Sequence, residues 1–553
     1  MRFIPLILVL TIFNPLVPAA TSAATMPRTQ AEISDYAETT THEQVMAFLH
    51  ELQRQSDHMR LETLLISAEG REVPLVVAGD PLPQSPPMAH EDDRPIVYIQ
   101  ANIHAGEVAG KEALLMFMRD LLLGDRQELL KKNVFLFVPN YNSDGNERLS
   151  PENRSYMPNP DKGVGVRHTS QGYDLNRDSI KTDARETHAL LERLILHWDP
   201  HVFIDLHTTD GSFHQHTVTY LSARAPNWDT AISDYLWNTL YPTVDRELRR
   251  RDIKTLPYGN FMHRAEPEKG WGTFAPSPRI LVDYMGLRNR LAILVEMYAF
   301  APYRTRVEHC LALLEELAAF TSLQGGTIQE LVRAADLAAA ANALQPPAER
   351  EPVCLEVSSG PLPEPLTIES FVLEPFVDER GRQRSRPLLD QPKTYEVPYF
   401  ARFECVRSTP APWAYVLPAG TETAVAQLLR HGVRVERILT AGEISAEQFF
   451  STELKVDERL DQGHNALSLK GEWKGQTLTL KTGDYLVPMN QSLARLTVCL
   501  LEPEHPDSLV SWNFFNNFVT RQWYRDLPPL PIYKIMEPLP LNTRRLTARD
   551  LED

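Results

Sequence analysis

Residues 95–123 decide the fold, and they read PIVYIQANIHAGEVAGKEALLMFMRDLLL. The stretch opens with β-branched and aromatic residues from Ile96 to Ile99, which is typical of a buried strand. From Ala113 onward the apolar residues recur at helical spacing. The stretch therefore predicts a strand, a loop and a helix, and the loop carries His104 and Glu107.

Further strands and helices follow along the chain. Apolar runs at 134–138, 201–206 and 293–295 predict three more strands, and a helix-like segment lies between Thr182 and His197. Alternation of strands with helices indicates an α/β fold in which helices cover both faces of a sheet. Two amphipathic helices are expected to close this domain, from Arg304 to Leu323 and from Thr327 to Leu344.

A chain of 553 residues exceeds what one hydrophobic core usually serves, so we expect at least two domains. In the second half, residues 414–438 predict a strand-helix-strand unit, and Leu467 to Leu480 alternate like a hairpin around Gly475. The expected segments are a signal peptide (1–24), a first α/β domain (25–345), a Pro-rich linker with the start of an accessory region (346–398), and a mixed α/β or β-rich C-terminal accessory domain (399–553).

The first residues resemble a secretory signal. Arg2 supplies a positive charge, residues 3–20 are apolar, and residues 22–24 are small. A retained membrane anchor is the alternative, but Pro5 and Pro15 interrupt the stretch. We therefore expect a secreted or periplasmic protein with no stable membrane span after signal removal.

Composition excludes several classes of function. The 56 Lys and Arg against 73 Asp and Glu give a net charge of −17, which opposes binding to nucleic acid or anionic lipid. No Gly-rich phosphate-binding loop occurs. The four cysteines lack metal-type spacing, and both disulfides and buried thiols stay open for them: Cys310, Cys354, Cys405 and Cys499.

Histidines that follow strands are the candidate chemistry. His104 and Glu107 come directly after one predicted strand, and His207 ends another. In open α/β sheets, ligand sites gather at the carboxyl ends of strands. Two histidines, one carboxylate and a water form the composition of a catalytic zinc site. The alternative is a pair of core-edge histidines that bind backbone carbonyls.

Further segments are similar to one known family. Asp174-Leu175-Asn176-Arg177 resembles a signature of the zinc carboxypeptidases, of the carboxypeptidase A, B and E kind. Residues 138–145 resemble the Asn-Pro-Asp-Gly turn of that family, and residues 291–296 resemble the strand that carries its glutamate base. Arg167 precedes Arg177 by ten residues, as in the carboxypeptidase E branch. The resemblance covers roughly residues 40–325 and implies a zinc-carboxypeptidase-like mixed sheet flanked by helices.

The resemblance assigns a metal centre and a base. It implies one zinc ion per chain with His104, Glu107 and His207 as ligands. Glu296 would be the general base that takes a proton from the attacking water. Asp174 would hydrogen-bond His104 and fix its tautomer.

The resemblance also assigns the groups that bind substrate. Arg167 would polarise the scissile carbonyl with a permanent positive charge, although Arg148 and Arg154 lie nearby in the sequence. Asn176 and Arg177 would bind the terminal carboxylate of a peptide. These roles predict a secreted zinc metallocarboxypeptidase. Two alternatives are the same metal centre acting on cell-wall peptides or N-acyl amino acids, and a non-catalytic peptide-binding protein of this fold.

One departure concerns a tyrosine. The family usually places a mobile tyrosine about two dozen residues before its glutamate base, but residues 271–274 read Trp-Gly-Thr-Phe. Tyr258 or Tyr284 are the candidates to replace it. The preference for the side chain at the cleaved end stays open.

Overall fold

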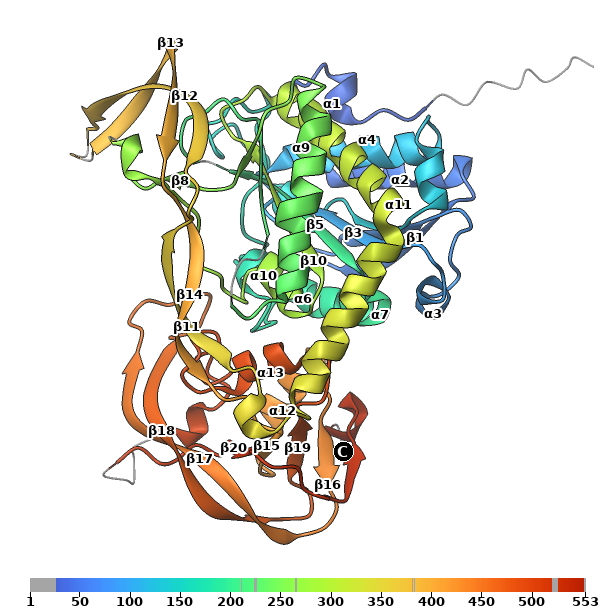
Figure 1. The fold of residues 1–553 in the computed structure, drawn as a ribbon. Coiled ribbons are helices and arrows are strands. Elements are labelled where there is room, and N and C mark those ends of the chain that lie inside the picture. Colours follow the sequence, from blue (N-terminus) through green and yellow to red (C-terminus); the bar gives the residue numbers. More distant parts are fainter. Residues whose placement is uncertain are drawn as a thin grey trace, which may run out of the picture.

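The computed structural model describes residues 26–551, except 210, 223–225, 264–265, 380, 382 and 520–525. The expected signal peptide, residues 1–24, lies outside the described residues. We call residues 26–342 the N-terminal body and residues 353–551 the C-terminal body (Figure 1). Among the described residues, no helix combines the length and the apolar character that crossing a membrane requires.

An eight-stranded mixed sheet forms the centre of the N-terminal body. Its middle strands β4, β3, β5 and β10 run parallel, and helical segments connect them, as parallel strands require. Antiparallel neighbours flank them on both sides. In spatial order the strands are β1 (Met59–Ile66), β2 (Glu72–Ala78), β4 (Val134–Val138), β3 (Ile96–Ala101), β5 (Val202–Thr209), β10 (Leu291–Tyr298), β6 (Val218–Leu221) and β7 (Thr255–Pro257).

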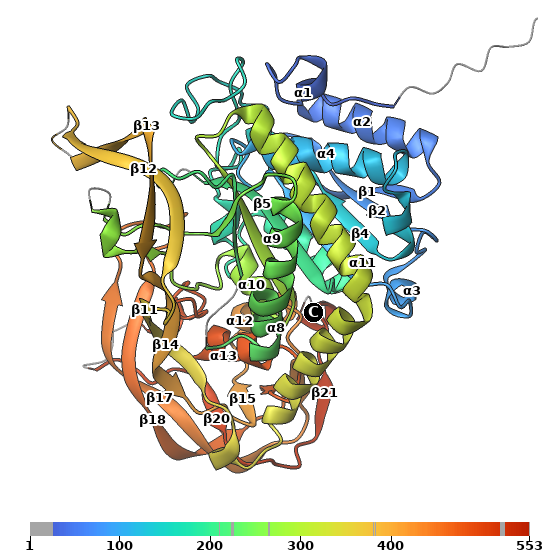
Figure 2. The same ribbon diagram turned by 45° about the horizontal axis from the view of Figure 1, so that its top comes forward.

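Helices cover both faces of this sheet, which confirms the predicted fold class (Figures 1 and 2). One face packs against α2 (His42–Gln55), α4 (Val108–Leu122), α9 (Tyr241–Arg249) and α11 (Tyr303–Asn342). The other face packs against α6 (Arg185–Ala189), α7 (Leu196–Trp198) and α10 (Leu281–Leu287). Shorter helices are α1 (Gln30–Ile33), α3 (Pro86–His90), α5 (Ser143–Asn146) and α8 (Thr230–Tyr235).

Helix α11 is one continuous helix, so the prediction of two separate helices was wrong. Gly325 and Gly326 lie inside it rather than between two helices. A Cβ on Gly325 would lie 2.7 Å from Cδ of Pro95, so this glycine lets the helix approach the start of β3. Packing against the sheet therefore outweighs the low helix propensity of the two glycines.

The segment 346–398, expected as a Pro-rich linker, consists mostly of strands. These are β11 (Val353–Pro361), β12 (Leu366–Val377) and β13 (Gln383–Val397). Strands β12 and β13 form a two-stranded hairpin that projects from the molecule (Figure 1). A two-stranded ribbon has no central strand, and edge strands of this kind tolerate prolines such as Pro375 and Pro387.

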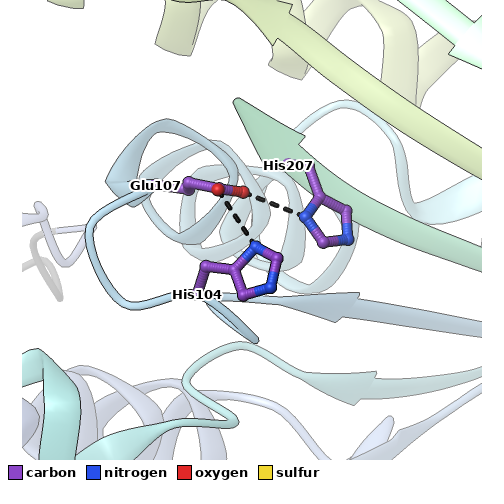
Figure 3. Close-up of side chains that lie close together, drawn as sticks. All are labelled: His104, Glu107 and His207. Atoms are coloured by element: carbon purple, nitrogen blue, oxygen red, sulfur yellow. Dashed lines mark hydrogen bonds and ion pairs between the residues drawn. The ribbon is translucent and has the colours of Figure 1, made fainter. Parts of the chain in front are cut away.

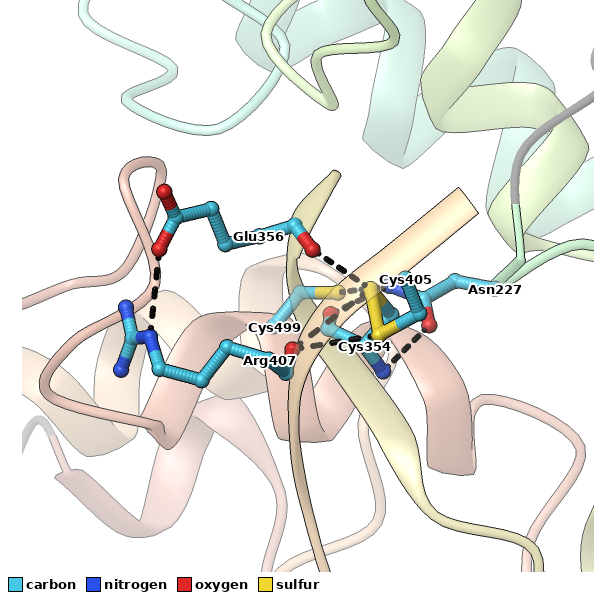
Figure 4. Close-up of a disulfide and its surroundings, with 6 residues drawn as sticks. All are labelled: Asn227, Cys354, Glu356, Cys405, Arg407 and Cys499. Atoms are coloured by element: carbon cyan, nitrogen blue, oxygen red, sulfur yellow. Dashed lines mark hydrogen bonds and ion pairs between the residues drawn. A yellow bond between two sulfur atoms is a disulfide. The ribbon is translucent and has the colours of Figure 1, made fainter. Parts of the chain in front are cut away.

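A small sheet joins the two bodies. Strand β14 (Tyr399–Thr409) pairs with β11 on one side and with β9 (Trp271–Gly272) of the N-terminal body on the other. Strand β9 in turn pairs with β8 (Asn260–Phe261). A disulfide between Cys354 and Cys405 links β11 to β14 (Figure 4), whereas Cys310 and Cys499 are buried thiols. The backbone of Cys354 also exchanges two hydrogen bonds of 2.8 Å with the side chain of Asn227.

The rest of the C-terminal body is a seven-stranded sheet with α12 (Glu422–Arg430) and α13 (Ala494–Leu501). The hairpin expected within 467–480 is instead one strand, β18, which pairs along its length with β17. Gly475 faces Glu447 in the middle of this ladder and makes no turn. In spatial order the strands are β18 (Leu467–Leu480), β17 (Gly442–Val456), β20 (Tyr533–Ile535), β15 (Ala414–Leu417), β19 (Tyr485–Pro488), β16 (Glu436–Ile438) and β21 (Thr543–Arg545).

Candidate metal centre and substrate pocket

Three side chains from separate elements converge at the carboxyl ends of β3 and β5 (Figure 3). His104 lies in the loop after β3, Glu107 immediately precedes α4, and His207 lies on β5. The carboxylate of Glu107 lies between the two rings, with Oε1 3.0 Å from Nδ1 of His104 and Oε2 2.9 Å from Nδ1 of His207. All three residues are buried, and their potential ligand atoms lie within 4.8 Å of one another.

Carboxylates on the far side of each ring orient the two histidines. Nε2 of His104 lies 3.2 Å from Oδ1 of Asp174, and Nε2 of His207 lies 2.9 Å from Oδ2 of Asp205. An Nε2–H that faces a carboxylate leaves the Nδ1 lone pair free to bind a cation. Asp174 was predicted from the sequence. Asp205 was not, although it lies two residues before His207 and hence on the same face of β5.

The donor set fits zinc. Two imidazole nitrogens and one carboxylate are ligands that zinc prefers, and a set of three leaves a position open for water or substrate. Burial alone would raise the pKa of Glu107, but His104 and Arg154 hold that pKa well below its usual value. The carboxylate is therefore ionised and ready to bind a cation. This pattern agrees with the predicted single zinc ion per chain.

Glu296 lies beside the metal centre. It is the register partner of His207 in the parallel ladder of β5 and β10. Its Oε2 atom is buried and makes no hydrogen bond within the described part of the chain. Burial raises the pKa of Glu296 to about 8, against the opposing effect of His207. A cation at the three ligands would favour the ionised form, so the group can both accept and release a proton.

A cavity of about 400 Å³ opens onto these residues. The predicted residues that line it are His104, Glu107, His207, Glu296, Arg167, Asn176 and Arg177, while Asp174 lies behind His104. Its apolar wall consists of Phe274, Ala275, Ile280 and Leu294. Tyr258 also lines the cavity, whereas Tyr284 is buried against His431 and lies outside it. Of the two tyrosine candidates, only Tyr258 therefore reaches the cavity.

Two arginines contact the residues of the metal centre. Nε of Arg167 donates to Oδ2 of Asp174 at 2.7 Å, and its Nη1 lies 3.2 Å from Nδ1 of His104. Nη2 of Arg154 donates to Oε1 of Glu107 at 2.5 Å. A Cβ at Gly106 would lie 2.8 Å from Nε of Arg154, so this glycine makes room for that side chain. Arg148 instead pairs with Glu69 away from the cavity.

The turn at Asn176 and Arg177 is held from both bodies. Asp174 accepts the Asn176 N–H at 3.0 Å, and the Asn176 side chain accepts the Leu281 N–H at 2.9 Å. Burial lowers the pKa of Arg177, an effect that neighbouring arginines reinforce and Asp174 opposes. Gln462 of the C-terminal body accepts the Asp174 N–H at 2.5 Å. No pattern in the sequence indicates that contact, because the two residues are 288 positions apart.

Comparison with known proteins finds similarity over stretches of different length. Residues 45–228 match the family model described as zinc carboxypeptidase. "Carboxypeptidase 2" of Trichophyton equinum is 22% identical over 518 residues, which cover 90% of this chain and 87% of that protein. "Carboxypeptidase 2" of Trichophyton tonsurans is 23% identical over 521 residues, with the same coverage of 90% and 87%. Both alignments extend far beyond residues 45–228, into the C-terminal body.

Among solved structures, a metallo-carboxypeptidase from Burkholderia cenocepacia is 18% identical, with a TM-score of 0.38 over 51% of this chain and 69% of that one. The carboxypeptidase A from Helicoverpa armigera is 14% identical, with a TM-score of 0.38 over 52% and 74%. The family model covers the segment that carries His104, Glu107, His207 and the Asp174–Arg177 turn. Residues 45–228 are therefore similar to the zinc carboxypeptidase family, and together with the His-Glu-His site this similarity indicates a zinc-dependent metallocarboxypeptidase.

Proposed function

We propose that this chain is a secreted or periplasmic enzyme that removes the C-terminal residue from peptides with a free terminal carboxylate, with Glu296 as general base. The observation that carries the proposal is the unpaired, buried Oε2 of Glu296 beside His207, in the same cavity as Arg177. The signal-like sequence 1–24 and the disulfide between Cys354 and Cys405 support an oxidising compartment outside the cytoplasm.

The residues of the cavity divide the work of peptide hydrolysis. Zinc held by His104, Glu107 and His207 would polarise the scissile carbonyl and lower the pKa of a bound water. Glu296 would accept a proton from the attacking water and later donate it to the leaving amine. Its raised pKa suits both steps, because the group then exchanges protons near neutral pH.

Arginines would handle the two negative charges of the reaction. Arg167 is held by Asp174 beside His104, where its permanent charge would stabilise the developing oxyanion. Arg177, together with Asn176, would bind the terminal carboxylate through charge-assisted hydrogen bonds. A clamp of this kind fixes cleavage at the last peptide bond, because only a chain end supplies the carboxylate.

The test measures release of a C-terminal amino acid from a defined peptide and from the same peptide with an amidated C-terminus. We expect cleavage of the acid only, loss of activity with a chelator and recovery with zinc. Glu296→Gln should lower kcat by about 10²- to 10⁴-fold while one zinc per chain is retained. The matched control Glu308→Gln, on the exposed surface of α11, should leave kcat unchanged.

Other outcomes identify the alternatives. Zinc binding without cleavage of any peptide, unaffected by Glu296→Gln, would indicate a peptide-binding protein. Cleavage of N-acyl amino acids or cell-wall peptides but not of ordinary peptides would identify those compounds as the substrates. Equal cleavage of the acid and the amide would contradict the role proposed for Arg177.

A further inference from the structure

A second cavity, of about 300 Å³, lies where the β12–β13 hairpin meets the loops that follow β5 and β10. We call it the aromatic cleft. Phe213, Phe261 and Phe300 line it from the N-terminal body, and Leu373 and Phe376 line it from the hairpin. The Phe376 side chain is 43% exposed, so the cleft is open to solvent on the hairpin side.

A row of rings leads from Glu296 to this cleft. Tyr298 lies two residues after Glu296 and hence on the same face of β10. The ring centre of Phe300 lies 5.5 Å from that of Tyr298 and 4.7 Å from that of Phe213. An extended chain of four residues spans at most about 14 Å, so Phe300 lies within a few peptide residues of the proposed base.

Two chain segments connect the surroundings of the two cavities. Arg154 lines the catalytic cavity, and Tyr156, two residues later, contacts Phe300 with ring centres 6.5 Å apart. Thr209 lines the catalytic cavity, and Gly211 lines the aromatic cleft. The cleft and the catalytic cavity are therefore neighbours in the fold.

The cleft and the cavity that holds the proposed carboxylate clamp are lined by different residues. Asn176 is bonded to Leu281 at the start of α10, and α10 lies far from the outer part of the hairpin in both views (Figures 1 and 2). A peptide with its carboxylate on Arg177 and its scissile bond beside Glu296 would extend its N-terminal part away from α10. The row of rings from Tyr298 to Phe213 would offer that part of the peptide a path to the aromatic cleft.

The hairpin is fixed in place at the cleft. Oγ of Ser370 donates to the carbonyl of Phe213 at 2.6 Å, and the Gln215 side chain donates to the carbonyl of Ser370 at 2.6 Å. The Glu369 N–H is bound by Nε2 of His216 at 3.1 Å. These bonds tie β12 to the loop that follows His207, so the apolar side chains of the hairpin have a set position relative to the metal centre.

We propose that the aromatic cleft binds an apolar side chain of the substrate, two to four residues on the N-terminal side of the scissile bond. This inference rests on the proposed peptidase function. Aromatic and aliphatic side chains form most of the lining of the cleft, and its two charged residues, Arg384 and Asp378, pair with each other at 3.2 Å. Burial of an apolar side chain among phenylalanine rings is favourable, whereas a polar side chain would lose its hydration.

Binding to the inactive, zinc-loaded Glu296→Gln protein tests the cleft separately from catalysis. The probes are two hexapeptides with the same last two residues, one with leucines and one with serines at the upstream positions. We expect the leucine peptide to bind about tenfold more tightly. In Glu296→Gln/Phe376→Ala this preference should fall to about twofold or less. The matched control Leu389→Ala removes an apolar side chain that is 71% exposed on the same hairpin, and the preference should persist there.

Kinetic measurements on the wild type and on Phe376→Ala test the role of the cleft and the proposed peptidase function separately. Phe376→Ala should lower kcat/KM for the leucine hexapeptide and leave kcat/KM for an N-acyl dipeptide unchanged. Two results would contradict the proposed role of the cleft. One is equal affinity for the two hexapeptides, and the other is an equal decrease of kcat/KM for the hexapeptide and the dipeptide in Phe376→Ala. Absence of any cleavage by the wild type would instead contradict the proposed function. The binding measurement would still show whether the cleft prefers an apolar side chain.

Discussion

Asp205 is the residue whose contacts bear most directly on the metal centre without being a ligand itself. Its Oδ2 lies 2.9 Å from Nε2 of His207, and its Oδ1 accepts a hydrogen bond of 3.2 Å from the side-chain amide of Gln100. We expect Asp205→Ala to weaken zinc affinity by about 10- to 100-fold, because the imidazole loses the partner that fixes its tautomer. Competition with a chromophoric chelator measures this. The exposed Asp93→Ala serves as control, and equal affinity in both variants would contradict the role.

Sequence reasoning reached the metal centre because its residues carry local signals. His104 and His207 both follow strands, and parallel strands end at the same edge of a sheet. Asp205 could have been found from its position two residues before His207. Arg154 was noted only as a neighbour of Arg167 and Gln462 was not noted, because their contacts with Glu107 and Asp174 arise from the tertiary fold and not from a sequence pattern.

Helix α4 shows how the packing of an element sets the geometry of the site. A Cβ on Gly110 would lie 2.6 Å from Cβ of Leu206, so only glycine lets α4 lie this close to β5. Gly110→Ala should destabilise the protein by about 1–3 kcal/mol and weaken zinc binding, because Glu107 moves with the helix. Gly326→Ala in α11 meets nothing within 4 Å and should stabilise the protein by about 0.5–1 kcal/mol. Denaturant unfolding of both variants checks the opposite signs.

Helices and strands were predictable where the apolar residues follow one clear periodicity. They were not predictable where pairing with a distant strand determines the structure. The strand at 96–99 and the following helix were readable because burial imposes their patterns. Strands β12 and β13 were not, because their prolines lie on a free-edged ribbon that looks like a linker in sequence. For β18, the pairing with β17 continues past Gly475, where the sequence alone indicated a turn.

At the scale of the whole molecule, the two bodies share one apolar core. The cluster on one face of the large sheet continues through Tyr415, Val487 and Trp512 of the C-terminal body. The Gln427 side chain donates to the carbonyls of Ile180 and Lys181, three to four residues after the proposed carboxylate clamp. The length of the chain predicts more than one structural unit. It does not predict that the units share a core, because the residues of that core are distant in the sequence.

An ion pair across the two bodies makes their association depend on pH. Nε2 of His464 lies 2.8 Å from Oδ2 of Asp183, and this hydrogen bond raises the pKa of His464 above its usual value. A raised folded-state pKa adds stability that is full below the unfolded value of about 6.5 and is lost as pH rises through the folded value. The pair is partly exposed, so its contribution is at most about 1 kcal/mol. We expect the coupling energy from a double-mutant cycle of His464→Gln and Asp183→Asn, measured by denaturant unfolding, to be largest near pH 6 and near zero at pH 9. A coupling energy that does not change with pH would show that the histidine interacts with Asp183 through a neutral hydrogen bond alone.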